Sequence, residues 1–158
     1  MQQTAIAFKS GDLNLEGIVA RPSGTSGAIP IAVLCHAHPA LAGTMEHPLL
    51  LAVNKALVDA GIATLRFNFR GVGASEGTFT NGEREGEDVA AALLVAGRWP
   101  GVRRGRVGVV AYSFGAGVVL RDKGRGRRAR ATVLVSPPPS ALAGSRLLGE
   151  KVPRLILS

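Results

Sequence analysis

The segment over residues 106–117, which reads RVGVVAYSFGAG, constrains the fold of this chain more than any other stretch. Its first half is an apolar run typical of a buried strand, and its second half is rich in small residues that suit a helix start. Ser113 lies at the junction, with Ala111 two residues before it and Gly115 two residues after it. A tight strand-to-helix turn has room only for small residues at those two places. The segment therefore predicts a serine on a strained turn, the geometry of a nucleophile elbow.

Strands and helices are expected to alternate along the chain. Apolar runs and alternating patterns predict strands, and apolar residues spaced by three and four predict helices. The expected strands are residues 4–8, 13–20, 31–35, 62–69, 107–111, 131–135 and 152–157, and the expected helices are residues 49–60, one beginning near Asn81 and Gly82, and one after Ser113. The first two strands flank Ser10-Gly11-Asp12 and should form a hairpin. This order predicts a three-layer α/β/α sandwich around a mostly parallel, doubly wound sheet.

The length and composition indicate one domain over residues 1–158. The 158 residues, 46% of them hydrophobic, are enough for one apolar core and too few for two ordinary domains. No apolar run approaches the roughly 18 residues of a membrane span, and the first twenty residues lack the pattern of a secretory signal. Cys35 is the single cysteine, in an apolar run that favours a small buried residue over a reactive one. We therefore expect a soluble, cytoplasmic protein.

The formal net charge of +8 raises the question of nucleic-acid binding, because the densest basic block, RDKGRGRRAR, spans residues 121–130. That block contains no aromatic residues on which bases could stack, and the whole chain is only 4% aromatic. It also falls between two expected core elements. The sequence therefore favours a solvated loop and helix end over a nucleic-acid-binding surface.

Three stretches together resemble the α/β-hydrolases, and specifically their small, lidless, bacterial group similar to dienelactone hydrolases. LCHAHPALAGTM, residues 34–45, is similar to the group's His-x-His-Pro loop with its paired glycines, here Ala42 and Gly43. LRFNFRGVGASEG, residues 65–77, is similar to its Arg-Gly-x-Gly-x-Ser-x-Gly segment. AYSFGAG, residues 111–117, is similar to its Gly-x-Ser-x-Gly elbow. The order and spacing of the three stretches also agree with the family.

The resemblance implies a role for each matching residue. Ser113 would be the nucleophile that attacks the carbonyl of a small ester, and the backbone N–H groups of Phe114 and His38 would form the oxyanion hole. The residues that would shape the elbow and the loops around it are Ala111, Gly115, His36, Gly43, Arg70, Gly71 and Gly73. Of these, Arg70 would hydrogen-bond the carbonyls of a neighbouring loop. No cofactor or metal is expected, since His36 and His38 lack a third ligand and His47 lies beyond their loop.

The chain departs from the family after the elbow. An acid and then a histidine should follow the serine, but all three histidines precede Ser113, and only Asp122 and Glu150 follow it. One interpretation is a C-terminally incomplete copy that lacks its last strand, helix, acid and base, and turns over substrate weakly or not at all. The alternative is a non-catalytic binding or interaction protein on the same scaffold, with an exposed sheet edge available for self-association. His38 as a substitute base is the least favoured interpretation.

Overall fold

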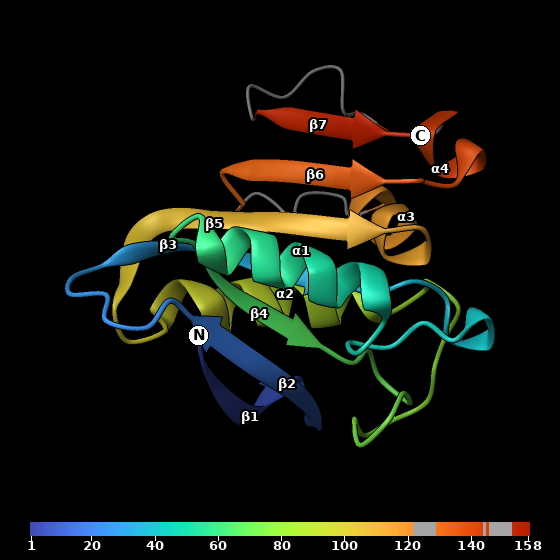
Figure 1. Cartoon of the computed structure of the whole chain (residues 1–158). Helices are drawn as coiled ribbons and strands as arrows, with labels where there is room; N and C mark the ends of the chain where they lie inside the picture. Colours follow the sequence, from blue (N-terminus) through green and yellow to red (C-terminus); the bar gives the residue numbers. More distant parts are fainter. Residues whose placement is uncertain (122–128, 144, 146–152) are drawn as a thin grey trace.

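A seven-stranded sheet forms the centre of the computed structural model, which describes residues 1–121, 129–143, 145 and 153–158 (Figure 1). In chain order the elements are β1 (Gln2–Ser10), β2 (Leu13–Arg21), β3 (Ile29–Cys35), the 3-10 helix η1 (Pro39–Leu41), α1 (Pro48–Asp59), β4 (Ala63–Phe67), α2 (Glu85–Arg98), β5 (Val102–Tyr112), α3 (Phe114–Arg121), β6 (Ala131–Val135), α4 (Pro139–Ala143) and β7 (Arg154–Leu157). The strand order is β1-β2-β4-β3-β5-β6-β7. β1 and β2 form an antiparallel hairpin, β2 is antiparallel to β4, and the other neighbours are parallel. The predicted mostly parallel sheet is confirmed.

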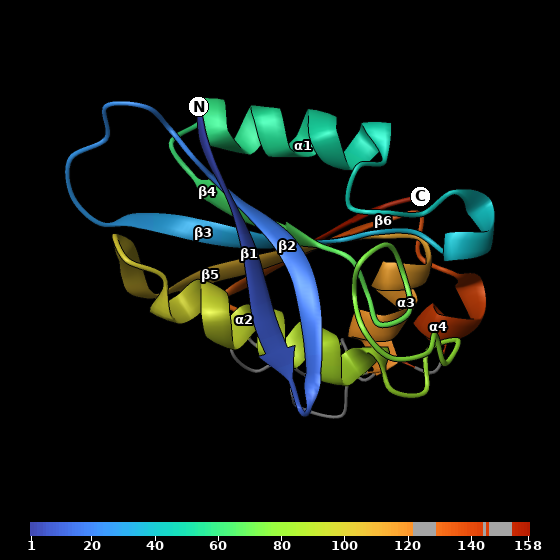
Figure 2. The ribbon, with the colours of Figure 1, turned by 90° about the horizontal axis from the view of Figure 1, so that it is seen from below.

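Helices cover both faces of the sheet, which gives the predicted three layers. α1 lies on one face, whereas α2, α3 and α4 lie on the other (Figure 2). The larger apolar core lies between the sheet and α2, and includes Phe67, Leu93 and Val109. A smaller cluster beneath α1 includes Leu34 and Leu50. β3 and β4 are therefore covered on both faces, and the continuous apolar run of β3 agrees with this position.

Helix α2 begins at Glu85, later than the predicted start near Asn81 and Gly82. The backbone explains the difference, since φ is +54° at Asn81 and +98° at Gly82, outside the helical region. The carboxylate of Glu85 instead accepts hydrogen bonds from the N–H of Gly82 at 2.7 Å and of Thr80 at 2.6 Å. The first acidic residue of the helix thus closes the preceding loop.

The last strand in the sheet, β7, presents apolar side chains to solvent. Leu155, Ile156 and Leu157 are 51%, 43% and 48% exposed. In Figure 1, α1 lies in front of the middle of the sheet, and no described helix lies in front of β6 and β7. Most of the basic block, residues 122–128, and the acids Asp122 and Glu150 lie outside the described residues. No helix within the described residues has the length and apolar character of a membrane span.

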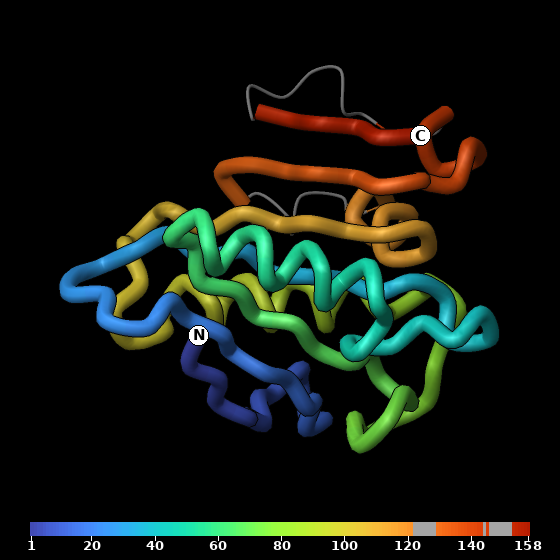
Figure 3. Tube along the Cα trace, in the orientation of Figure 1, coloured from blue at the N-terminus to red at the C-terminus, as the bar shows by residue number. Residues whose placement is uncertain are grey.

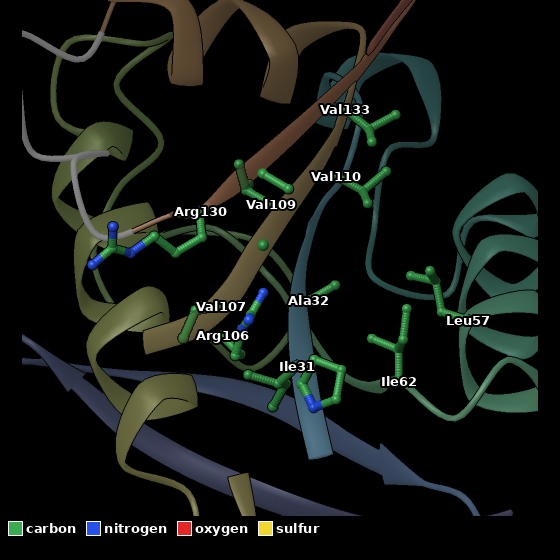
Figure 4. Close-up of a pocket in the computed structure, with 13 residues that line it drawn as sticks. Ile31, Ala32, Leu57, Ile62, Arg106, Val107, Val109, Val110, Arg130 and Val133 are labelled. Carbon is green, nitrogen blue, oxygen red and sulfur yellow. The ribbon is translucent and has the colours of Figure 1, made fainter. Parts of the chain in front are cut away.

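A cavity of about 330 Å³ lies between α1 and strands β3, β5 and β6 (Figure 4). Leu57, Ile62 and Val110 contribute apolar walls, and Arg106 and Arg130 line its end near the start of β5 and β6. Ser113 does not line it. The cavity therefore lies along the first half of β3, the middle of β5 and the first residues of β6, whereas the elbow lies at the carboxyl end of β5.

Candidate active site

Ser113 stands on the turn between β5 and α3 with a left-handed backbone, at φ +51°. Non-glycine residues adopt this conformation at a cost, and they concentrate at functional sites. The N–H of Ser113 donates to the carbonyl of Val135 at 2.9 Å, which ties the turn to the end of β6. Among the described residues, the Ser113 hydroxyl has no hydrogen-bond partner. The turn thus carries a serine hydroxyl that no described residue holds by a hydrogen bond.

The two small residues of the elbow serve different purposes. Ala111 is fully buried at the end of β5, so its methyl group packs inside the core. Gly115 donates its N–H to the carbonyl of His36 at 3.2 Å. A Cβ at Gly115 would lie 2.7 Å from that oxygen and 2.9 Å from the carbonyl oxygen of Cys35. The close approach of the elbow to the end of β3 therefore requires glycine at residue 115.

Strained backbone gathers at the same edge of the sheet. Among the described residues, the non-glycine residues with positive φ are Ala42, Asn81, Ser113 and Ser136. They follow β3, β4, β5 and β6, so they lie in loops at the carboxyl ends of four parallel strands (Figure 3). Ala42, at φ +57°, occupies the first of the paired-glycine places, where a left-handed backbone suits glycine. Doubly wound folds bind ligands at this edge.

His38 lies beside the elbow, and both of its ring nitrogens are engaged. Nδ1 accepts from the N–H of Ala40 at 3.1 Å, and Nε2 lies 3.1 Å from Oδ1 of Asn81. Its ring contacts Phe79 and Phe114, with centroids 5.0 and 5.2 Å away. Because these contacts occupy the imidazole, His38 is not placed to take the proton of a serine. The structure therefore argues against the substitute-base interpretation.

Two backbone N–H groups near Ser113, those of His38 and Phe114, have no backbone acceptor in the part of the chain that the structure describes. Among the described residues, none accepts from the N–H of His38. α3 begins at Phe114, so the N–H of Phe114 has no acceptor within the helix. The side chains of these two residues are in contact, which brings the two loops together. Two unpaired donors on neighbouring loops are the parts from which an oxyanion hole is built.

His36 is a fully buried brace between the ends of β3 and β4. Its Nδ1 lies 2.6 Å from the carbonyl oxygen of Ala37, and its Nε2 accepts from the N–H of Phe69 at 3.1 Å. Nδ1 therefore carries the proton of the neutral ring. Burial lowers the pKa of His36 to about 4, helped by the nearby charge of His47 and opposed by the bond to Ala37. A neutral His36 holds the loop that carries His38.

We expect this brace to make stability depend on pH. Because the pKa of His36 is lower in the folded state than its ordinary value of 6.5, the unfolded chain binds the extra proton between about pH 6.5 and 4. The free energy of unfolding should therefore fall as pH drops through this range, by at most about 1.4 kcal/mol per unit. Urea unfolding of the wild type and His36→Gln at several pH values measures the effect. The variant should lose this excess slope, and parallel slopes would contradict the assignment.

Arg70 pairs with carboxylates of α2, which corrects the expectation that it would hydrogen-bond loop carbonyls. Its Nη2 donates to Oδ1 of Asp88 at 2.7 Å and to Oε2 of Glu87 at 3.0 Å, and its guanidinium is buried. The hydrogen bonds with Asp88 raise the pKa of Arg70, with smaller contributions from Glu87, although burial opposes them. Asp88 also accepts from the hydroxyl of Ser10 at 2.7 Å. Arg70 thus anchors the loop after β4 to α2.

The two glycines after Arg70 lie where a side chain would collide. Gly71 and Gly73 have φ of +70° and +57°. A Cβ at Gly71 would lie 2.5 Å from the backbone nitrogen of Phe79, and one at Gly73 would lie 2.3 Å from Oε1 of Glu16. That Glu16 oxygen also accepts from Nδ2 of Asn68 at 2.7 Å. Sequence reasoning missed Glu16 and Asn68, whose hydrogen bonds tie this loop to β2.

Cys35 and the histidines do not form a further reactive site. Cys35 is fully buried, and burial together with the charge of Asp88 raises the pKa of its thiol. A buried, protonated thiol is inert. Within the described residues, no three or more His, Cys, Asp or Glu side chains form a group that could hold a metal ion.

Solved structures of bacterial hydrolases match nearly the whole chain. A Coxiella burnetii protein described as an alpha-beta serine hydrolase homologue is 31% identical with a TM-score of 0.79, and the match covers 99% of this chain and 73% of that chain. This chain belongs to the α/β-hydrolase superfamily. A putative α/β-hydrolase from Agrobacterium tumefaciens is 29% identical with a TM-score of 0.79, over 98% of this chain and 69% of that one.

Two further comparisons bear on the extent of the likeness. A Xanthomonas campestris α/β serine hydrolase without a lid is 23% identical with a TM-score of 0.76, over 99% of this chain and 83% of its own, and shows the shared fold. An uncharacterized protein of Rickettsia prowazekii (strain Madrid E) is 34% identical over 138 residues, which are 87% of this chain and 56% of that protein. This chain thus spans little more than half of this curated relative. No protein-family model matches it.

Proposed function

We propose that this chain carries the nucleophile and the oxyanion hole of a serine hydrolase of carboxylesterase type, which acts on small esters. The observation that carries the proposal is Ser113 itself, which has a left-handed backbone, a hydroxyl without a described partner and a place at the start of α3. Strained non-glycine residues of this kind concentrate at functional sites. The Ser113 oxygen would bond to the ester carbonyl carbon as a base removes the hydroxyl proton, and the ester C–O bond would then break, so that the alcohol leaves with a proton and an acyl-enzyme remains on Ser113.

The oxyanion formed in this reaction would be stabilised by the N–H groups of Phe114 and His38. Both donors belong to the main chain, so their directions depend on the elbow and on the loop over residues 36–43. Each such donor typically contributes about 3–4 kcal/mol to the stability of the transition state. The bonds from Gly115 to His36 and the contact between the rings of His38 and Phe114 support this placement.

We further propose that the acid and the base that activate Ser113 lie outside these 158 residues. No histidine follows Ser113 in the sequence, and the ring nitrogens of His36 and His38 are engaged. The relatives are longer and contain further residues that could include an acid and a base, since the chain spans 73% of the Coxiella protein and 56% of the Rickettsia protein. On this proposal, residues 1–158 are one hydrolase domain without its complete triad.

The group within the superfamily is also a proposal. The connection between β6 and β7 spans only residues 136–153, too few for an inserted lid domain of ordinary size. The Xanthomonas structure, which is described as lacking a lid, covers 99% of the chain. These observations support the small lidless group similar to dienelactone hydrolases.

Acylation of Ser113 tests the proposed function directly. We expect p-nitrophenyl acetate to acetylate Ser113 slowly, and added imidazole to accelerate the reaction by acting as the external base. Triads that lack one member retain about 10³–10⁴-fold acceleration over water. Mass spectrometry of the peptide containing Ser113 measures the acetyl group, and released nitrophenolate measures turnover.

Two serine variants control for chemical background. Ser113→Ala should remove the labelled peptide and the protein-dependent nitrophenolate, whereas Ser26→Ala, in an exposed loop, should change neither. No acetyl group on Ser113 at any imidazole concentration contradicts the proposed hydrolase and favours the non-catalytic alternative. Rapid hydrolysis without imidazole that Ser113→Ala abolishes would instead overturn the proposal that the base lies outside this chain.

A further inference from the structure

The loop that carries the backbone N–H of His38, a proposed oxyanion donor, is bound by the side chain of Asn81. Nε2 of His38 lies 3.1 Å from Oδ1 of Asn81, which belongs to the loop between β4 and α2. The two residues are far apart in the sequence, so this contact exists only in the folded chain. It joins the loop after β3 to the loop after β4 at the edge where Ser113 stands.

The hydrogen bonds of His38 select one tautomer of its ring. Nδ1 accepts from the N–H of Ala40, so in the neutral ring the proton must sit on Nε2. Nε2–H then needs an acceptor, and the amide oxygen of Asn81 supplies it. The same ring caps the 3-10 helix η1, and the carbonyl of His38 accepts from Leu41 and Gly43 at 2.9 and 3.1 Å. The orientation of the ring and the path of the backbone at His38 are therefore linked.

The left-handed backbone conformation of Asn81 is fixed by the hydrogen bonds of its two neighbours. Its φ is +54°, and the residues on either side of it are tied to Glu85. The fully buried carboxylate of Glu85 accepts from the N–H and the hydroxyl of Thr80 at 2.6 and 2.8 Å and from the N–H of Gly82 at 2.7 Å. Burial raises the pKa of Glu85, but these hydrogen bonds outweigh it and leave the pKa below its usual value. An ionised Glu85 thus fixes the loop that presents Asn81.

The aromatic neighbours of His38 connect this arrangement to the elbow. The rings of His38, Phe79 and Phe114 are in mutual contact, with centroids between 5.0 and 5.2 Å apart. Phe79 comes from the loop that carries Asn81, and Phe114 directly follows Ser113. A rotation of the His38 ring would therefore disturb the residues that carry both proposed oxyanion donors.

We infer that Asn81 is a positioning residue for the oxyanion hole: by accepting from Nε2–H, it fixes, together with the N–H of Ala40, the tautomer and orientation of the His38 ring and so the direction of the His38 N–H. This inference rests on the proposed function for its catalytic consequence. Its structural part, the dependence of the His38 ring on Asn81, stands independently. Glu85 acts one step further away, by holding the loop on both sides of Asn81.

Nitrogen NMR of the His38 ring tests the inference, with two substitutions at residue 81. Asn81→Gly retains the left-handed backbone without strain and removes the acceptor, whereas Asn81→Asp retains a side-chain oxygen. We expect the wild type and Asn81→Asp to hold the proton on Nε2 of His38, and Asn81→Gly to show a mixture of tautomers and a shifted His38 amide resonance. Asp59→Ala, which breaks an exposed ion pair with Lys55 within α1, away from this loop, should leave the His38 signals unchanged.

The imidazole-assisted acetylation rate of Ser113 gives the second measurement. Asn81→Gly should slow it by about 10- to 100-fold, as expected for a displaced rather than a deleted donor, and Asn81→Asp should restore most of it. An unchanged tautomer in Asn81→Gly overturns the inference, as does a wild-type acetylation rate in that variant. If wild-type Ser113 is never acetylated, the proposed function fails, and the tautomer measurement still decides whether Asn81 positions His38.

Discussion

The Asp88→Ala variant should unfold with a free energy lower than that of the wild type by about 3–5 kcal/mol. Asp88 is fully buried, and its carboxylate accepts from Nη2 of Arg70 and from the hydroxyl of Ser10, each at 2.7 Å. Without it, the half-buried Glu87 is the one partner of opposite charge left to the buried guanidinium of Arg70 among the described residues. An uncompensated buried charge is strongly destabilising. Urea unfolding followed by circular dichroism measures the loss.

Two further variants separate burial from charge. Asp59→Ala breaks an exposed pair on α1, in which Lys55 and Asp59 are 73% and 61% exposed, so little stability should be lost. The double variant Arg70→Met with Asp88→Leu removes both charges at once, and it should recover part of the stability lost in Asp88→Ala. A loss in Asp88→Ala no larger than that in Asp59→Ala would refute the buried-pair explanation.

Gly43→Ala should abolish the acetylation of Ser113 and lower the free energy of unfolding by about 1–3 kcal/mol. A Cβ at Gly43 would lie 2.0 Å from the carbonyl oxygen of Ala37 and 2.7 Å from that of His38. Both atoms belong to the backbone, so the clash cannot be relieved by a side-chain rotation. The loop must open, and the hydrogen bond from Gly43 to His38, at 3.1 Å, is lost with it. Acetylation by mass spectrometry and urea unfolding measure the two effects.

A second glycine provides the matched control. Gly86 lies in α2, and a Cβ there would meet nothing within 4 Å. Gly86→Ala should therefore stabilise the protein by about 0.5–1 kcal/mol, because alanine has the higher helix propensity. It should leave acetylation of Ser113 unchanged. Equal acetylation in Gly43→Ala and Gly86→Ala would mean that the loop over residues 36–43 does not contribute to the site.

The strands and the elbow were accessible from the sequence because they depend on local patterns. The apolar run at residues 131–135 became β6 with the same bounds, and the expected helix over residues 49–60 became α1. The alternation of the two element types was sufficient for the α/β class. The small residues around Ser113 similarly predicted the turn, since steric room is a property of neighbouring residues.

The hydrogen-bond and ion-pair partners of polar side chains could not be predicted from local sequence patterns. Arg70 was expected to bind loop carbonyls, but it binds Asp88, which arrives from α2 on the far side of a loop. Asn81 was considered only as part of a helix start, although it accepts from the ring of His38 and its loop is held by Glu85. A signal existed in the close spacing of Glu85, Glu87 and Asp88 at the start of a helix. That spacing does not reveal which of them turns inward.

The sequence by itself determined the layered α/β architecture, the strained place of Ser113 and the absence of any histidine after it, since these follow from residue order and local sterics. The tertiary structure alone decided that His38 is occupied by Ala40 and Asn81, that His36 is a buried neutral brace, and that Arg70 pairs with Asp88. Apart from the bond between His38 and Ala40, these contacts join residues far apart in the chain. Their partners depend on how loops and helices pack at the carboxyl edge of the sheet, which local patterns do not encode.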